Sequence, residues 1–376
     1  MEIYILSSTF ETLGVLAPYI SLTHSREFAG SGSFKLRLPY TDKMFDLLTE
    51  DNILMWEDGG TRAVYIDTVV CETEKDGEMM TVSGKNLRGL LDRRIIWHPW
   101  KYHLNGYAET IGRMIVDENA VNPLDSDRVI PGLVLGDTTG AAASTPYLSI
   151  EPDRDNVETF LNNLTETAGV GFDIRYDKHQ KQMIFEAYMG TDHTAGQSEN
   201  PKVIISRDRN RVSAMTYSRS GASSKNTALI IGWENEDTGV IYSDSILSGS
   251  GLGRREIYVK GSSSKPKADE NEGITLADAE ARYAAEQRQK AAEELAERKP
   301  ALSLDVDVDR SSIPGLDLGD RVTVRERRYN NLTMNTHIAE ITAYYEGGGA
   351  VYNVVLGDAI PTVYKKLIVK SKEMRK

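Results

Sequence analysis

Apolar and polar residues alternate along both ends of this chain, and this pattern constrains the fold more than any other feature. Residues 1–85 contain segments such as "EIYIL" and "SGSFKLRLP", with turn signals at Gly59-Gly60 and at Lys75-Asp76-Gly77. A period of two is typical of β-strands with one buried face, and glycine at positive φ favours tight hairpins. These residues therefore predict a first β-barrel or meander.

The other end of the chain has a similar texture. Residues 301–360 include "LSLDVDVD", "DRVTVRE" and "AVYNVVLGD", with hairpin signals at Asn330-Asn331 and at Gly347 to Gly349. We expect a second barrel-like set of strands that loosely echoes the first, although no strict repeat period is visible.

The middle of the chain has helical spacing. "GYAETIGRMIVDEN" and "DNVETFLNNLTETAG" each place apolar residues on one face, and in the second segment Asp155 is the predicted N-cap and Gly169 the stop. "GVGFDIRYDKHQKQMIFEAYMG" predicts a hairpin, whereas residues 121–146 show no period and predict a long exposed loop. Residues 86–202 are therefore expected to form an α+β peripheral domain.

Residues 203–300 are expected to hold strands, flexible loops and a connecting helix. The strands at 203–260 are candidates to complete the first barrel. The Ala- and Glu-rich helix predicted from Thr275 to Pro300 has a thin apolar face, which suits a surface or a neighbouring subunit. The predicted fold is thus β-rich α+β, with a first barrel at 1–85, a second at 301–362 and a basic tail at 363–376 that contains Lys365, Lys366, Lys370, Lys372, Arg375 and Lys376.

Composition limits the possible functions. The chain has 376 residues, a formal net charge of -12 and one cysteine, Cys71. The charge disfavours nonspecific nucleic-acid binding, which depends on Lys and Arg displacing counterions. A lone cysteine excludes an internal disulfide and a multi-cysteine zinc site. Since no apolar stretch reaches 18 residues and the amino terminus has no basic leader, we expect a soluble protein without a signal peptide.

Motifs for known chemistries are incomplete. His98 and His103 could be metal ligands, but there is no HExxH pattern and no supporting cysteine. "DVDVDRSSIPGLDLGD" begins like a calcium loop, yet Arg310 stands where that loop needs Gly and Leu316 where it needs Glu. The chain also has no P-loop, nucleophile elbow or dinucleotide fingerprint. We therefore predict no metal, no cofactor and no catalytic residue.

A strand explains the calcium-like segment better. Its apolar residues alternate with polar ones over eight positions, so one face is apolar and the other acidic. The acidic face is expected to contact solvent or the wall of a channel. The apolar set is Leu302, Leu304, Val306 and Val308, and the polar set is Ser303, Asp305, Asp307 and Asp309.

Residues 82–97, "VSGKNLRGLLDRRIIW", predict a strand that ends at Gly84 and a short helix that follows. Arginines late in a helix suit its carbonyl end, whereas a phosphate site needs free amides at the helix start. The structural interpretation is therefore favoured over phosphate binding. Leu87, Leu90 and Leu91 are expected to point inward, and Arg88, Asp92 and Arg93 outward.

The order of these landmarks resembles the tail hub proteins of tailed bacteriophages and prophages, including baseplate hubs and the amino-terminal module of tail-associated lysin and tail-tip proteins. The resemblance spans residues 1–360. It rests on "VSGKNLRGLLDRRII", the α+β insertion, the late Ala/Glu helix, and "LDLGDRVTV" followed by "IAEITAYYEGGGAVYNVVLGD". Its most specific residues are Gly84, Leu87, Leu90, Leu91, Arg94, Leu318, Gly319 and Asp320.

The resemblance implies a structural role in a virion tail that assembles in the bacterial cytoplasm. Hub chains carry two related β-barrel domains, so a homotrimer places six barrels around a pseudo-sixfold channel through which DNA passes. Implied partners are the tail tube or distal tail protein, the tape measure protein, and a spike, fibre or receptor-binding tail-tip protein, with DNA only in transit and no membrane binding by the chain itself. Because an acidic wall repels phosphates over about a Debye length, Asp305, Asp307 and Asp309 are predicted to line the lumen.

Two other classes of function stay open. A tail-tip peptidoglycan or glycan hydrolase needs paired carboxylates across a cleft, and 56 acidic residues single out no pair. A host-glycan-binding adhesin would use an aromatic cluster such as Trp97, Trp100 and Tyr102. We expect no enzymatic activity, because many relatives continue into a lysin or fibre-bearing region, whereas this chain ends in "KKLIVKSKEMRK".

Overall fold

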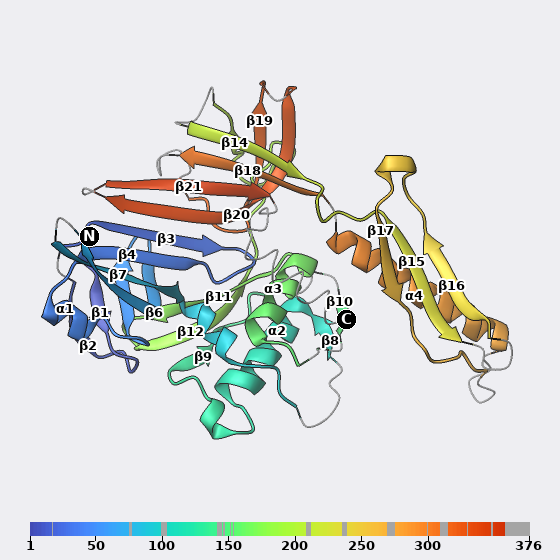
Figure 1. The fold of residues 1–376 in the computed structure, drawn as a ribbon, viewed down its shortest axis with the longest axis horizontal. Helices are drawn as coiled ribbons and strands as arrows, with labels where there is room; N and C mark the ends of the chain where they lie inside the picture. Colours follow the sequence, from blue (N-terminus) through green and yellow to red (C-terminus); the bar gives the residue numbers. More distant parts are fainter. Residues whose placement is uncertain are drawn as a thin grey trace. The chain divides into compact units, whose positions relative to one another are not determined.

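The computed structural model describes the chain except for residues 17, 75–76, 99–103, 141–144, 146, 151, 153, 208–211, 235–238, 269–274, 299, 309–314, 329, 347–348 and 358–376. Its described residues form two compact units, one of residues 1–216 with 304–357 and one of residues 217–303 (Figure 1). No helix in the part so described is long and apolar enough to cross a membrane. The predicted domain boundaries at residues 85, 202 and 300 remain a prediction.

One large mixed β-sheet makes up most of the first unit, and the ends of two of its strands, at residues 217–220 and 301–303, belong to the second unit. The strands of this sheet are β1 (Tyr4–Leu6), β2 (Thr12–Val15), β3 (Ser21–Glu27), β4 (Ser33–Pro39), β5 (Ile53–Glu57), β6 (Thr61–Glu74), β7 (Gly77–Asn86), β13 (Ile204–Ile205), β14 (Val212–Ser220), β18 (Ala301–Val308), β19 (Arg321–Glu326), β20 (Leu332–Glu346) and β21 (Gly349–Gly357). They lie in the order β14-β18-β21-β20-β3-β4-β7-β6-β5-β1-β2, with β19 beside β20 and β13 beside β19. The predicted β-rich character of both chain ends is confirmed, but among the described strands no barrel closes.

The predicted hairpins join these strands. Gly59 and Gly60 have φ values of 62° and 143° between β5 and β6, and Asn330 and Asn331 both have φ of 54° between β19 and β20. Residues 75–76 and 347–348 lie outside the described part. The strands on either side of them nevertheless pair as antiparallel neighbours.

Helices and two small sheets, β10-β8 and β11-β12-β9, lie against the part of the large sheet formed by the amino-terminal strands. They are α1 (Asp42–Leu47), the short 3-10 helix η1 (Leu87–Arg93), β8 (Leu104–Tyr107), α2 (Ala108–Val116), η2 (Asp117–Val121), η3 (Ser126–Arg128), β9 (Leu133–Leu135), β10 (Tyr147–Ile150), α3 (Val157–Ala168), β11 (Gly171–Asp177) and β12 (Gln182–Tyr188). The helices at α2 and α3 and the β11–β12 hairpin are confirmed. One apolar core joins η1, α2 and α3 to residues of β1, β5 and β6.

Two local predictions in this region are wrong. The N-cap of α3 is Asn156 and not Asp155, because the Asn156 side chain accepts the Thr159 N–H at 2.9 Å. Residues 121–146 are not simply an exposed loop, since β9 pairs in parallel with β12 and Leu133 is buried. The predicted stop of α3 is confirmed at Gly169, whose φ is 70°.

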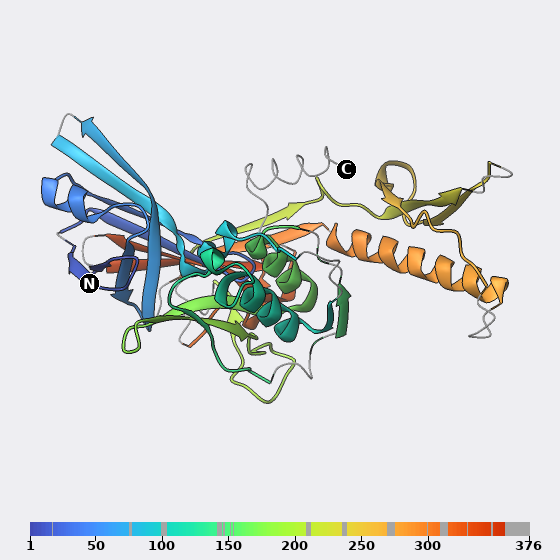
Figure 2. The same ribbon diagram turned by 90° about the horizontal axis from the view of Figure 1, so that it is seen from below.

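The second unit consists of β15 (Thr227–Glu234), β16 (Ile241–Ile246), β17 (Glu256–Lys260) and the helix α4 (Leu276–Glu297). Strand β15 lies in the middle, antiparallel to β16 and parallel to β17, and α4 packs on one face of this sheet (Figure 2). The predicted helix start is confirmed, because Thr275 and Asp278 form a reciprocal capping box.

Helix α4 buries Tyr283 and Ala291 against this sheet, and many of its other described residues are exposed, which is consistent with a helix at a surface. Two expectations for residues 203–300 need correction. Strand β16 includes residues 243–246, which open the segment "SDSILSGSGLGRRE" that was expected to be a flexible loop. Strands β15, β16 and β17 pair with one another, so of the strands at 203–260 only β13 and β14 join the large sheet.

Candidate functional site

The segment that opens the helical region is held by a close backbone approach at Gly84. Strand β7 continues through Gly84 to Asn86, so the predicted strand end at Gly84 is wrong. A Cβ atom at this position would lie 2.0 Å from the Tyr65 carbonyl oxygen on β6. Glycine is therefore required because β6 and the β7 backbone leave no room for a side chain.

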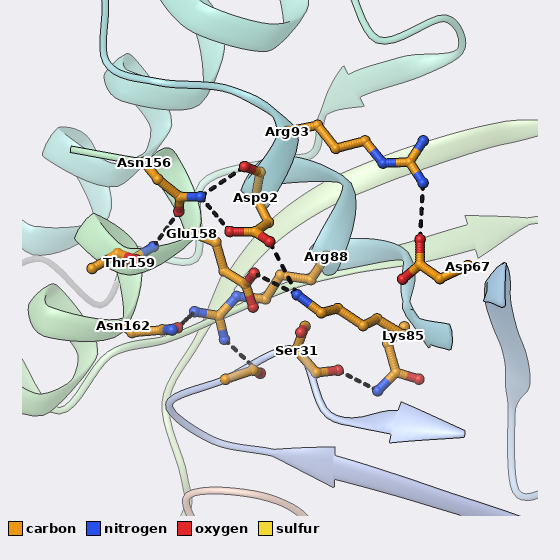
Figure 3. A network of polar contacts seen from close by, with 12 residues as sticks. Ser31, Asp67, Lys85, Arg88, Asp92, Arg93, Asn156, Glu158, Thr159 and Asn162 are labelled. Carbon is orange, nitrogen blue, oxygen red and sulfur yellow. Dashed lines mark hydrogen bonds and ion pairs between the residues drawn. The ribbon is translucent and has the colours of Figure 1, made fainter. Parts of the chain in front are cut away.

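The helix η1 that follows carries a buried arginine. Leu87 and Leu91 are fully buried as predicted and Leu90 packs partly against the same core, but Arg88 is only 1% exposed and does not point outward. Its Nη1 donates a hydrogen bond of 2.9 Å to the Gly30 carbonyl, and its Nη2 donates to Asn162 Oδ1 on α3 (Figure 3). Burial lowers the pKa of Arg88, but a guanidinium stays charged at any ordinary pH.

A second set of contacts ties η1 to the start of α3. Lys85 Nζ lies 3.2 Å from Asp92 Oδ2 and 3.6 Å from Glu158 Oε2, and Asn156 Nδ2 donates to the Asp92 backbone and side chain. Burial lowers the pKa of Lys85, but Glu158 and Asp92 outweigh this and leave the pKa above its ordinary value. Figure 3 shows these side chains converging between η1 and α3.

Arg93 anchors η1 to the large sheet. Its Nη1 lies 2.6 Å from Asp51 Oδ1, its Nη2 lies 3.1 Å from Asp67 Oδ1, and its guanidinium stands over the Tyr65 ring at 4.7 Å. Asp51 precedes β5, and Asp67 is the residue that β6 leaves unpaired at a β-bulge. Arg88 and Arg93 thus form a clamp between the helices and the sheet, and we use this name for the pair below.

The sheet that this clamp supports contains the same three-stranded module twice. Module A is β5-β6-β7, and module B is β19-β20-β21. Every pair in β20–β21 matches a pair in β6–β7 whose residue numbers are 272 lower, as for Glu346 with Gly349 and Glu74 with Gly77. Both hairpins shift register at the same place, between Ile66 and Thr68 in module A and between Ile338 and Glu340 in module B.

The turn that enters each module is also repeated. Asp51 N donates to the Ile66 carbonyl at 2.9 Å, and Gly319 N donates to the Ile338 carbonyl at 2.9 Å. Asp51 and Gly319 have φ values of 67° and 82°, so both turns need a left-handed residue. The Asp51 carboxylate binds the clamp, whereas the matching Gly319 has no side chain.

The repeat extends beyond the modules. In the first half of the sheet the strand order is β3-β4-β7-β6-β5, and in the second half it is β14-β18-β21-β20-β19. Each of these five strands therefore has a counterpart in the other half. The halves join where β20 pairs with β3 from Glu340 opposite Glu27 to Glu346 opposite Ser21.

Charged and aromatic side chains reinforce this junction. Asp58 in the β5–β6 turn accepts hydrogen bonds from the hydroxyls of Tyr345 at 2.7 Å and Tyr352 at 3.0 Å. Arg26 on β3 lies 2.6 Å from Asp317, in the turn before β19. Burial alone would raise the pKa of Asp317, but Arg26 lowers it, and the net pKa lies below its ordinary value.

His24 is buried at the same junction. It lies on β3 opposite Ala343 of β20, and its Nε2 is 2.6 Å from Asn86 Oδ1. The Trp56 ring packs edge-on against it, with 4.9 Å between ring centroids. Burial lowers the pKa of His24 to about 4, although the Asn86 hydrogen bond acts in the opposite direction.

The other predicted motif residues also have structural contacts. A Cβ atom at Gly319 would lie 2.6 Å from the Phe28 ring. Asp320 is buried, and its carboxylate accepts the Thr191 N–H at 2.7 Å and the Asp317 N–H at 2.8 Å. Arg94 Nε donates to the Arg128 carbonyl at 2.6 Å.

Several predicted sites are only partly within the described structure. Val306 is buried as the alternation requires, but the side chains of Asp305 and Asp307 and the whole of Asp309 lie outside the described part. Trp97 is 46% exposed beside Arg154, whereas Trp100 and Tyr102 fall in the undescribed residues 99–103. The basic tail lies outside it as well.

The arrangement of the described residues does not support a metal site at His98 and His103. His98 Nε2 lies 3.0 Å from Glu118, and His103 is in the undescribed residues 99–103. Among the residues that can be searched, no three His, Cys, Asp or Glu side chains gather in a way that could hold a metal ion.

The family model described as "Siphovirus ReqiPepy6 Gp37-like protein" matches residues 2–358. The chain belongs to this family. The resemblance to tailed-phage tail proteins that the sequence indicated is thereby confirmed. No curated protein matches the chain.

Solved structures share the fold at low identity. The prophage tail protein gp18 from Listeria monocytogenes is 10% identical, with a TM-score of 0.55 and full coverage of both chains. A 43 kDa tail protein of prophage MuSo2 from Shewanella oneidensis is 16% identical, with a TM-score of 0.55 over 95% of this chain and 98% of that one. A tail protein from Neisseria meningitidis is 13% identical, with a TM-score of 0.54 over 95% and 96%.

Sequence reasoning missed the clamp, the Asp58 contacts and His24. Arg88 sits in an otherwise apolar stripe, at a position where a solvated arginine is the ordinary expectation. Its only signal was its place between Leu87 and the buried Leu91. For Asp58 and His24 no signal exists in one sequence, because their partners are remote in the chain.

Proposed function

We propose that this protein is a structural tail or baseplate hub, in which three chains form a pseudo-sixfold ring that ends the tail tube and joins it to the tail tip or spike. The observation that supports this most strongly is the repeated module. The two halves of the sheet share the same strand order, and the hairpins β6–β7 and β20–β21 share the same register. Each chain therefore carries two similar β-sheet units, with similar edges and similar faces. Three such chains present six similar units around one axis, and a head-to-tail contact repeated by a closing rotation generates a ring.

In this proposal each half of the sheet serves as one tube-type, barrel-like domain of the ring. In this role the polar face of the ring surrounds a channel for DNA in transit. Asp305 and Asp307 of β18, together with Asp309, line the channel. Negative side chains there repel phosphates and keep DNA from adhering. Replacing all three by lysine should leave the ring intact and make it retain duplex DNA at low salt, and a ring that retains none would contradict the lumen assignment.

The proposed role places the chain in the virion tail. Its partners would be the tail tube or distal tail protein, the tape measure protein, and a spike, fibre or receptor-binding tail-tip protein. The chain itself would have no catalytic function.

The test is the native mass of the purified full chain over a range of concentrations, combined with low-resolution imaging. The proposal expects a three-chain species that grows with concentration and an open centre in its images. A two-chain species related by a twofold axis would refute the ring, because it uses one surface twice and cannot repeat around a channel.

A further inference from the structure

The outer half of β6, residues 68–74, has a sheet edge that no described strand covers. On its other edge this segment pairs with β7, and the β5 partner of β6 ends at Tyr65. Val70 is 43% exposed, and Cys71, Glu72 and Thr73 are also exposed. In Figure 2 the β6–β7 hairpin, in light blue, projects beyond the neighbouring strands. A long open edge of this kind is prone to pair with another strand, and natural proteins cover or block it.

The equivalent segment of module B is covered. Residues 340–346 of β20 correspond to residues 68–74 of β6, and β3 pairs with them along the whole length. The result is burial of one face, since Ile341, Ala343 and Tyr345 are only 3%, 4% and 6% exposed. Their counterparts on β6 are Val69, Cys71 and Thr73, so a strand added to β6 would bury these three side chains.

The structure also contains a strand suited to that place. Strand β3 stands first in the order of the first half, and β14 stands first in the order of the second half. Among the described strands β14 pairs only with β18, and it stands at the end of the strand order, so no described strand pairs with its other edge. Within one chain six strands separate β14 from β6 in the order of the sheet. By analogy with β3 and β20, the strand expected beside residues 68–74 of β6 is therefore β14 of a second copy.

We propose that β14 of one copy adds antiparallel to residues 68–74 of β6 in the next copy, and so repeats between chains the pairing that β3 and β20 make within a chain. The inference rests on the proposed ring and names the contact that closes it. The contact uses a different edge on each copy, so it is head-to-tail and continues the sheet from chain to chain.

Cys71 provides a native probe of this contact, because it is the only cysteine and is exposed. Its rate of reaction with an aromatic disulfide reagent is measured for the full chain at low concentration and in the assembled fraction. We expect the rate to fall at least about tenfold on assembly, which corresponds to about 1.4 kcal/mol of protection. An unchanged rate in the assembled fraction would overturn the proposal.

A pair of substitutions separates the two faces of the edge. Cys71→Lys places a charge on the face that the added strand must bury, whereas Glu72→Lys places it on the other face. Tyr344, the counterpart of Glu72, stays 43% exposed although β3 is paired beside it. We expect Cys71→Lys to raise the concentration needed for assembly at least about tenfold, which corresponds to about 1.4 kcal/mol. Glu72→Lys should assemble at nearly the same concentration as the unaltered chain. Equal effects would contradict the strand pairing.

Cross-linking identifies the partner strand. Met215 of β14 is buried on the core side and Thr216 next to it is exposed. A thiol cross-linker about 8 Å long spans opposite and diagonal neighbours on one face of a sheet. We expect Met215→Cys to cross-link to Cys71 of another copy and to yield covalent multimers. Thr216→Cys, on the opposite face, should yield few, and the reverse result would refute the assignment of β14.

The outcomes separate this inference from the proposed function. A ring of three chains with Cys71 still reactive and no cross-link overturns the strand pairing and leaves the hub. A protected Cys71 and the Met215→Cys cross-link in an assembly of another size support the pairing and overturn the ring of three. A chain that stays monomeric with a reactive Cys71 at every concentration overturns both.

Discussion

Lowering the pH should weaken the junction between the two halves of the sheet through His24. Burial lowers the pKa of His24 to about 4, with Arg26 and Arg62 acting in the same direction and Asn86 and Asp58 against it. In the unfolded chain the pKa of histidine is about 6.5. Below pH 6.5 the unfolded state therefore binds the proton more readily than the folded state does, and the free energy of unfolding falls as the pH is lowered.

The magnitude follows from the difference between the two pKa values. Each unit of separation is worth about 1.4 kcal/mol, so His24 should remove about 3 kcal/mol from the free energy of unfolding by pH 4 and almost nothing above pH 7. The loss occurs between pH 6.5 and pH 4. No discount for solvent is needed, because His24 is only 3% exposed.

The assay compares the full chain with His24→Gln, which keeps a hydrogen-bond donor near Asn86 but does not titrate. Urea unfolding of both proteins is followed from pH 7 to pH 4, and carboxylates that titrate in both cancel in the comparison. The unaltered chain should lose about 3 kcal/mol more than His24→Gln. Parallel profiles, or a His24 proton resonance that titrates near pH 6.5, would refute the reasoning.

Three further substitutions test individual contacts. Gly84→Ala places a Cβ against the Tyr65 carbonyl and should cost about 3 kcal/mol in urea unfolding. Gly196→Ala is the control, because a Cβ there meets no atom within 4 Å and its φ is not positive, and a cost as large there would contradict the steric explanation. Arg88→Ala leaves two acceptors unpaired beside a cavity and should cost about 4 kcal/mol, so a neutral result would show that the clamp does not hold the helices to the sheet. Asp58→Ala removes the acceptor of two tyrosine hydroxyls and should cost about 2 kcal/mol, while raising amide exchange along β3 and β20; unchanged exchange would refute its role at the junction.

The sequence predicted the features that depend on neighbouring residues. Hairpins follow from local glycine and asparagine, which take positive φ without strain, and α3 ends where Gly169 takes the left-handed conformation. The N-cap was placed one residue early, because Asp155 and Asn156 are both good caps and only the geometry decides between them.

Features that depend on remote residues were not predicted. The matching registers of modules A and B leave little trace in the sequence. A shared register requires only a similar alternation of apolar and polar residues, not identical residues. Cys71 and Ala343, for example, occupy equivalent positions and differ in type. Strand β9 is too short to show a period. The buried Arg88 donates its two Nη hydrogen bonds to the Gly30 carbonyl and to Asn162, and both lie far away in the chain.

The most direct test is a three-dimensional electron-microscopy reconstruction of the assembled full chain without imposed symmetry. We predict three copies around an open axis, with six bulged three-stranded modules at nearly equal angles and a continuous sheet between neighbouring copies. A closed globule without a central opening, or modules arranged about a twofold axis, would contradict the account.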